Sequence, residues 1–192
     1  KFDSVFRYSK LLETIDDADT SILSNITTLK LRKSFTPTLN SSTNYTVNFS
    51  NALHNPHSGH KAAQGGILSS TGFKVSGDSN VYFFDDDGQG NVRRYYLVGS
   101  VRTYVDNTAG TITYSSGAVA INALTMASIE NIRGAASTVI ELTVTPSSND
   151  IVPVRAQVID IDVANSTFTV QADTLVGGSA NAGIGYSTTS SY

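Results

Sequence analysis

The sequence predicts an α+β fold that is mainly antiparallel β-sheet with one N-terminal helix. Residues 2–19 carry apolar side chains at helical spacing, whereas most later segments alternate apolar and polar residues with a period of two. Turn-forming residues separate these segments at the spacing of a β-meander. Charged residues make up only 15% of the chain, against about 25% in a typical soluble domain. Ser, Thr, Asn and Gly take their place, as is common in β-rich proteins with many turns.

The first predicted element is the helix within residues 2–19. Its apolar residues fall on one face at spacings of three, four and one, and they are Val5, Tyr8, Leu11, Leu12 and Ile15. Ser4 is the expected N-terminal cap. Asp16, Asp17 and Asp19 follow the last apolar residue, where the helix macrodipole disfavours negative charge. The helix is therefore expected to end there.

Strands are predicted next, because the apolar period changes to two. Residues 29–35 and 45–49 each place apolar side chains on alternate positions, and residues 71–75 do so after the Gly65-Gly66 pair. Residues 81–99 form two apolar-aromatic runs around an acidic centre, which predicts a hairpin with its turn near Gly88 and Gly90.

The rest of the chain gives strands of different clarity. Residues 101–121 predict three short strands with turns at DNTAG and SSG, and residues 139–144 predict a strand that ends at Pro146. Residues 124–137 are ambiguous between helix and strand. Residues 150–173 predict two strands around a turn at Ala164-Asn165, with Pro153 delaying the first or confining it to an edge.

These elements suggest a division of the chain. A helix and a strand in residues 1–34 are expected to pack with residues 124–176. Residues 35–123 would form a β-rich subdomain, although one continuous β domain would show the same pattern. Residues 177–192 are rich in Gly, Ser and Thr and lack the apolar content for a core, which predicts a flexible tail.

The composition excludes several classes of function. There is no cysteine, so the chain has no disulfide and no thiolate site, as in proteins that fold in a reducing cytoplasm. A net charge of −3 predicts no affinity for nucleic acid or for an anionic membrane. No apolar run is long enough to span a bilayer. The chain begins at Lys1 and its only methionine is Met126, which suggests a piece of a longer protein.

A first candidate metal site is the stretch HNPHSGH, which holds the three histidines His54, His57 and His60. Zinc needs several imidazoles that converge on one point. Pro56 and Gly59 interrupt any helix here, and no cysteine is available, so a carboxylate from residues 85–87 would have to complete the site. We expect a polar surface loop instead, whose histidines bond to backbone groups or meet a neighbouring subunit.

A second candidate is the acidic turn of the predicted hairpin. It mimics the first half of a calcium loop through Asp85, Asp87, Gln89 and Gly90. Position twelve of such a loop would be Tyr96, where a bidentate Glu is required, so the EF-hand interpretation fails. A looser calcium site remains an alternative. The favoured interpretation is an ordinary turn whose charge is offset by Arg93 and Arg94.

No other pattern indicates catalysis or a cofactor. Arg93 to Tyr96 interleave basic and aromatic residues, as some nucleic-acid clamps do, but a strand would split them between two faces. Core tyrosines and surface arginines are expected there. The chain has no G-x-S-x-G elbow and no phosphate-binding G-x-x-x-x-G-K-[ST] motif. We therefore expect no catalytic residues, no cofactor and no enzyme activity.

Four stretches together resemble a known family. They are SKLLETIDDADTSILSNITTLKLRKSF (9–35), FFDDDGQGNVRRYYLVG (83–99), AGTITYSSGAVAI (109–121) and TPSSNDIVPVRAQVIDID (145–162). They are similar to the baseplate wedge protein of large contractile-tailed bacteriophages, the ring-forming wedge subunit related to the baseplate-J family. The end of the chain, DTLVGGSANAGIGYSTTSSY, is similar to the end of such a protein.

The resemblance implies a structural role in the virion. A wedge subunit dimerises, joins other wedge proteins and closes a ring in the tail baseplate, which assembles in the host cytoplasm. No catalytic residue carries over, and this chain would be the C-terminal part of the subunit. Such proteins bind through extended surfaces with a few anchor residues, and candidate anchors are Tyr45, Tyr82, Tyr104 and Tyr186.

Two alternatives come from other classes of function. A calcium- or carbohydrate-binding β module of a surface adhesin would use the DDDGQGN turn and exposed tyrosines. A small metallohydrolase would use the three histidines. Stabilisation by a bound cation would separate both from a structural protein. We rank the structural protein first, the adhesin module second and the metallohydrolase last.

Overall fold

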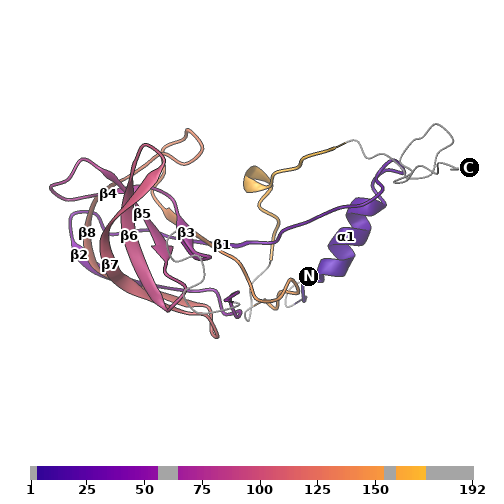
Figure 1. Ribbon diagram of the computed structural model, residues 1–192, viewed down its shortest axis with the longest axis horizontal. Coiled ribbons are helices and arrows are strands. Elements are labelled where there is room, and N and C mark those ends of the chain that lie inside the picture. The colour runs from indigo at the N-terminus through magenta and orange to yellow at the C-terminus, as the bar shows by residue number, and fades with distance from the viewer. Residues whose placement is uncertain (1–3, 56–64, 154–158, 172–192) are drawn as a thin grey trace, which may run out of the picture. The chain divides into compact units, whose positions relative to one another are not determined.

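The computed structural model describes residues 4–55, 65–153 and 159–171 (Figure 1). The chain divides into two compact units. One unit comprises Lys1–Tyr8 and Thr27–Val158, and the other comprises Ser9–Ile26 and Ile159–Tyr192. The first unit contains the β-sheet and is called the barrel unit below. The second contains most of the helix α1 (Tyr8–Asp16) and is called the helix unit.

The strands of the described residues form one antiparallel sheet in the barrel unit. They are β1 (Leu31–Phe35), β2 (Ser42–Asn48), β3 (Ser69–Ser70), β4 (Phe73–Val75), β5 (Val81–Asp86), β6 (Asn91–Val98), β7 (Val101–Thr113), β8 (Ala118–Ile129) and β9 (Ile140–Val144). Together with α1 they confirm the predicted fold class, a mainly antiparallel sheet with an N-terminal helix.

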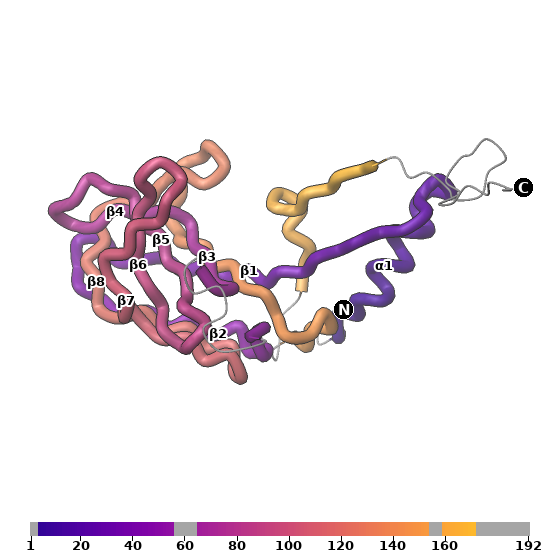
Figure 2. Tube along the Cα trace, in the orientation of Figure 1, coloured from indigo at the N-terminus to yellow at the C-terminus, as the bar shows by residue number. Residues whose placement is uncertain are grey.

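The sheet closes on itself. β5 pairs with both β4 and β6, and the ladders β4–β8, β8–β7 and β7–β6 complete a ring of five strands. Figures 1 and 2 show these strands curving around a common interior. β9 joins β1 to β3, so segments far apart in the sequence lie side by side. Closure gives each of these five strands a neighbour on either side, around one core.

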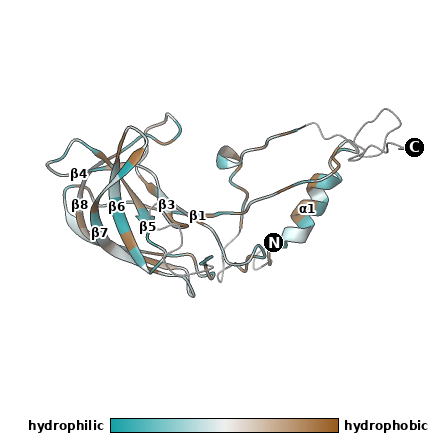
Figure 3. Cartoon of the chain, viewed as in Figure 1, coloured by the Kyte–Doolittle hydropathy of each residue, from teal (hydrophilic) through white to brown (hydrophobic). Residues whose placement is uncertain are grey.

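The core fills this interior with aromatic and aliphatic side chains. Phe73 and Phe84 are fully buried and stack with their ring centroids 4.7 Å apart. Met126, Ile140 and Leu142 are also fully buried. The predicted period of two holds in β2, where Tyr45 and Val47 are more buried than the residues beside them. Figure 3 shows both apolar and polar residues along the strands.

The predicted hairpin and its turn are confirmed. β5 and β6 pair in register from Tyr82–Tyr96 to Asp86–Val92. Gly88 and Gly90 both have positive φ, at 74° and 104°, a backbone region that glycine enters without a steric penalty. The SSG turn is confirmed too, since the backbone turns there and Gly117 has a φ of 75°.

The expected turn at DNTAG is wrong. β7 runs through it without a break, and the register against β6 shifts instead. The Asp106 carboxylate accepts the backbone N–H of Thr108 at 2.9 Å, so the polar residues bend the strand without ending it. Ala109 and Gly110 follow in buried positions. Residues that favour turns also favour β-bulges, and the sequence alone does not separate the two.

Gly110 is required by the close approach of β8. A Cβ at this position would lie 2.1 Å from the carbonyl oxygen of Ala120. We expect Gly110→Val to force β7 and β8 apart and to lower the free energy of unfolding by roughly 1–3 kcal/mol. Urea denaturation measures the change, with Thr111→Val at the exposed neighbouring position as the control. Equal unfolding midpoints for the two variants would refute this role.

Two further regions resolve or correct the sequence predictions. The ambiguous residues 124–137 are strand as far as Ile129, followed by a turn in which Arg133 and Gly134 have positive φ. The two strands expected within residues 150–173 are absent from the described part of that range. It contains a β-bridge at Ile151 and a short 3₁₀-helix, Val163–Asn165. The alternating pattern there meets no neighbouring strand, so no ladder forms.

Candidate assembly interface

The start of α1 is fixed by residues that lie far away in the sequence. Phe6 and Ile151 exchange two backbone hydrogen bonds, of 2.9 and 3.1 Å. The Asp150 carboxylate accepts the Tyr8 backbone N–H at 2.9 Å and Arg7 Nη1 at 3.1 Å. A carboxylate at a helix N-terminus satisfies an unpaired N–H and complements the macrodipole. Asp150 therefore takes the capping role expected for Ser4, and the helix begins at Tyr8.

Asp150 should make the start of the helix sensitive to acid. The Tyr8 N–H and then Arg7 hold the pKa of Asp150 below its usual value. A lowered folded-state pKa gives stability that is present above the usual Asp pKa and is lost as the pH falls through the folded pKa. We expect the NMR signal of the Tyr8 amide to move below about pH 4.

A substitution isolates the same contact at neutral pH. Asp150→Ala should shift the Tyr8 amide signal at neutral pH and abolish its movement in acid. Asp17→Ala, placed just after the other end of the helix, is the matched control and should leave the Tyr8 amide where it is. A Tyr8 amide that ignores Asp150→Ala would show that the carboxylate does not cap the helix.

The helix carries an apolar stripe that the described chain does not bury. Leu11, Leu12 and Ile15 are only half-buried, and no residue of α1 is buried. Polar and apolar residues are both visible along the helix in Figure 3. The helix ends at Asp16, as predicted, and the side chain of Asn25 donates to the Asp16 carboxylate at 2.6 Å. An apolar stripe of this kind normally faces a core.

The rest of the helix unit is equally exposed. None of its described residues is buried. Ile26 is 100% exposed, Phe168 80% and Val170 95%. Single exposed aliphatic residues are ordinary, but the described residues of this unit include no buried side chain and so form no core of their own. Apolar surface left unburied on this scale is typical of a protein-binding surface.

The histidine candidates are only partly within the described structure. His57 and His60 lie outside it. The backbone N–H of His54 donates to the carbonyl oxygen of Thr145 at 2.9 Å, so this end of the stretch is tied to the chain just after β9. Among the residues that the structure describes, no three His, Cys, Asp or Glu side chains are grouped to hold a metal ion.

Asp85 lies in a buried charge cluster. Its carboxylate accepts Arg93 Nε at 2.9 Å, Arg102 Nη1 at 2.7 Å and the Tyr104 hydroxyl at 2.7 Å. Burial raises the pKa of Asp85, and the Tyr104, Arg93 and Arg102 contacts oppose that shift. The cluster ties β5, β6 and β7 together inside the sheet, with every oxygen of the carboxylate engaged.

Asp87 accepts its hydrogen bonds within the hairpin turn and not within the Asp85 cluster. Its carboxylate accepts the backbone N–H groups of Gln89 and Asn91 and the Asn91 side-chain amide, at 2.7, 3.0 and 2.7 Å. Burial raises the pKa of Asp87, but the hydrogen bonds from Asn91 and Gln89 outweigh it, and the pKa lies below its usual value. The two carboxylates thus hold separate sets of partners.

The expected split between core tyrosines and surface arginines is wrong for Arg93. Tyr95 is buried as expected, but Arg93 is also buried, at 7% exposed. It stands opposite Asp85 in the β5–β6 register, and its guanidinium lies over the Tyr104 ring at 4.1 Å. A paired guanidinium can be buried where a free one cannot. Tyr82 is buried as well, with 5% of its surface exposed, which excludes it as a surface anchor.

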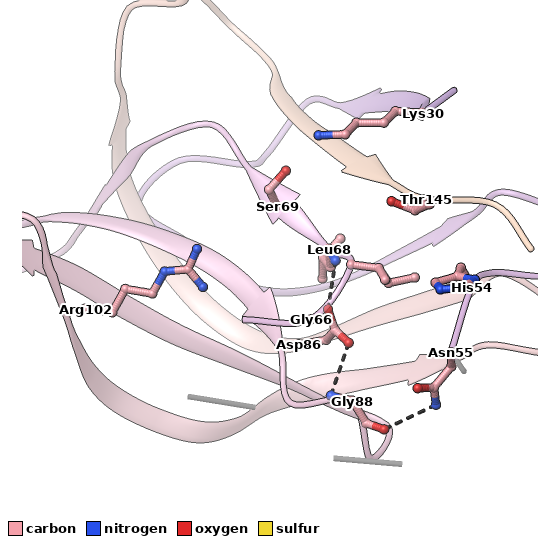
Figure 4. Close-up of a pocket in the computed structure, with 11 residues that line it drawn as sticks. Lys30, His54, Asn55, Gly66, Leu68, Ser69, Asp86, Gly88, Arg102 and Thr145 are labelled. Carbon is pink, nitrogen blue, oxygen red and sulfur yellow. Dashed lines mark hydrogen bonds between the residues drawn. The ribbon is translucent and has the colours of Figure 1, made fainter. Parts of the chain in front are cut away.

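A recess of about 390 Å³ opens in the barrel unit beside this cluster (Figure 4). It is lined by Lys30, His54, Asn55, Gly66, Ile67, Leu68, Ser69, Asp86, Gly88, Arg102 and Thr145. The buried Asp86 carboxylate accepts the N–H groups of Leu68 and Gly88 and the hydroxyl of Tyr114, at 2.7, 3.2 and 2.6 Å. Burial and Asp86 raise the pKa of Tyr114 far above its usual value.

No pattern in the sequence predicts this recess. Lys30 precedes β1 and Arg102 lies in β7, and the strand pairing from β1 through β9, β3, β5 and β6 to β7 brings both to one cavity. Asn55 also closes one side through a hydrogen bond of 3.2 Å to the Gly88 carbonyl oxygen (Figure 4).

Comparison with known proteins gives one family match. Residues 1–34 match the family described as "Baseplate structural protein gp6, C-terminal domain III". The matched segment includes α1 and most of β1. It also includes Phe6, Arg7 and Tyr8, which bond to residues 150–151. The match supports a structural role in a phage tail baseplate, in contact with other baseplate proteins. Searches of curated proteins and of solved structures found no match.

One further finding concerns membranes. Within the described ranges, no helix has both the length and the apolar character needed to cross a bilayer.

Proposed function

We propose that this chain is a structural part of a baseplate wedge subunit, acting through protein–protein assembly and not through catalysis. It forms a homodimer and contacts other wedge proteins in the tail baseplate ring, which assembles in the host cytoplasm. It binds neither nucleic acid nor membrane. The observation that carries the proposal is the helix unit, whose described residues are all unburied and whose N-terminal segment lies within the family match.

The exposed apolar residues explain why assembly is favourable. Burial of one aliphatic side chain contributes about 1.5–3 kcal/mol. The helix unit offers the half-buried α1 stripe. It also offers four exposed side chains, those of Leu23, Ile26, Phe168 and Val170. A standard interface buries about 800 Å² on each partner, and residues of this kind would supply the apolar part of such an area.

The internal organisation expected from the sequence stays part of the proposal. Residues 1–34 would pack with 124–176, residues 35–123 would form a β-rich subdomain, and residues 177–192 would be a tail. The clamp between Phe6, Arg7, Tyr8 and residues 150–151 supports the first pairing. Limited proteolysis tests it, because a stable fragment should keep both ends of the clamp.

Light scattering after size-exclusion chromatography tests the proposed function. We expect a dimer or larger species whose mass rises with concentration and does not change when EDTA is added. A chain that stays monomeric at all concentrations would contradict the proposal. A mass or melting temperature that changes with EDTA would favour a cation-dependent binding module. The pairing of Asp85 with two arginines argues against that alternative.

A further inference from the structure

The recess in the barrel unit has an excess of positive charge. Its lining includes two cations, Lys30 and Arg102, and one carboxylate, Asp86. Asp86 is 1% exposed and already accepts three hydrogen bonds. Arg102 shares the Asp85 carboxylate with Arg93, so two guanidiniums face one negative charge. The recess is therefore cationic, although the whole chain carries a net charge of −3.

The side chains are placed to receive an anionic group. Lys30 and Arg102 extend toward the recess from two sides, with Ser69 between them (Figure 4). Lys30 is exposed, and the Arg102 side chain is 32% exposed. Ile67 and Leu68 add aliphatic surface to the same lining. A ligand that fits this lining carries a carboxylate next to aliphatic groups.

The helix unit contains a segment of that chemistry. Residues 159–163, IDIDV, place Asp160 and Asp162 between aliphatic residues. Asp160 is exposed and accepts the backbone N–H of Ile161 at 2.9 Å. Ile161 and Val163 are 55% and 74% exposed. The segment has two negative charges and no positive charge, which complements the recess.

We propose that the cationic recess of one copy binds residues 159–163 of a second copy, with the Asp160 carboxylate between Lys30 and Arg102. The proposal rests on the self-assembly proposed above and assigns it a second contact, separate from the α1 stripe. In a two-fold dimer each copy supplies one recess and one segment, so the contact forms twice. Because it depends on partly exposed charges, salt should weaken it.

The absence of cysteine allows a direct test. Thr167→Cys, at an exposed position near the segment, takes a nitroxide spin label. The spin-labelled protein is made without ¹⁵N and is mixed with ¹⁵N-labelled native protein. Line broadening in this mixture reports only contacts between copies. We expect the amide signals of Gly66, Ser69 and Gly88 to broaden. Broadening that occurs only when the label and ¹⁵N share one chain would show that each chain binds its own segment, and would overturn the proposal.

Substitutions test the chemistry. Lys30→Gln and Asp160→Asn should each reduce the intermolecular broadening, and the charge swap of Lys30→Asp with Asp160→Lys should restore it. Lys74→Gln is the matched control, since Lys74 lies in β4, does not line the recess and pairs with Glu130. Equal broadening in Lys30→Gln and native protein would overturn the assigned pairing.

A peptide separates this proposal from the self-assembly on which it rests. The peptide IDIDV, titrated into ¹⁵N-labelled chain, should shift the same three amides, and Lys30→Gln should weaken its binding about fivefold. The peptide ININV should not bind. A dimer by light scattering with no response to IDIDV would refute the recess contact and leave the self-assembly intact. A monomeric chain that binds IDIDV would refute the self-assembly and the second copy as the occupant, and would leave only the preference of the recess for this segment.

Discussion

Replacing Leu11 and Ile15 together by Ser should convert the assembled chain to a monomer. Both side chains lie on the half-buried apolar stripe of α1, and in a homodimer each substitution counts twice. Burial of four such side chains is worth several kcal/mol, even when each is only partly covered. We expect the dissociation constant to rise more than a hundredfold, which corresponds to about 3 kcal/mol. Light scattering across a dilution series measures it.

The matched control changes the same helix on its polar side. Lys10 and Thr14 are exposed and have the same spacing of four, so Lys10→Ser with Thr14→Ser should leave the dissociation constant within about threefold. The barrel unit should stay folded in both double variants, as judged by near-ultraviolet circular dichroism of its tyrosines. A Leu11→Ser, Ile15→Ser chain that keeps the native mass would show that α1 is not the interface.

Arg93→Met should destabilise the barrel unit more than any surface substitution. Arg93 gives Asp85 two hydrogen bonds, at 2.9 and 3.2 Å, and gives the Asp86 carbonyl oxygen a third at 3.1 Å. Removing one partner of a buried pair leaves an uncompensated charge, at a cost of roughly 3–5 kcal/mol. Arg102 and Tyr104 still contact Asp85, so we expect a loss at the lower end of this range. Urea denaturation should show a free energy of unfolding lower by about 3 kcal/mol.

Arg133→Met provides the comparison for that result. Arg133 also pairs with a carboxylate, Glu141, but its side chain is 45% exposed. An exposed ion pair contributes about 0–1 kcal/mol to stability. The free energy of unfolding of this variant should therefore lie within about 1 kcal/mol of the native value. If Arg93→Met and Arg133→Met lower the free energy of unfolding by the same small amount, the buried charge cluster is not a main source of stability.

Local sequence signals predicted most of the fold because the forces that act there are local. The Asp16–Asp17–Asp19 cluster ends the helix through the macrodipole, and Gly88 and Gly90 permit the hairpin turn through their positive φ. The same signals misled at DNTAG, where turn-forming residues lie within a strand that pairs with β6 before and after the stretch and with β8 from Gly110 onward. They also predicted two strands within residues 150–173, and the described part of that range contains no strand.

The candidate site was predicted less well, because its geometry is set by distant parts of the chain. Asp150 caps a helix that begins 142 positions earlier, and no local pattern identifies such a cap. Arg93 is buried because Asp85 faces it across a ladder, which the alternation of a single strand does not reveal. The apolar stripe of α1 was visible in the sequence, but whether the chain itself would bury it was not.

Hydrogen exchange followed by mass spectrometry, at low and high protein concentration, tests the central claim most directly. We predict that the backbone amides of Ser9–Ile26 become more protected as concentration rises, while those of β8, inside the sheet, do not change. Exchange in Ser9–Ile26 that is the same at every concentration would contradict the assignment of the helix unit as the assembly surface.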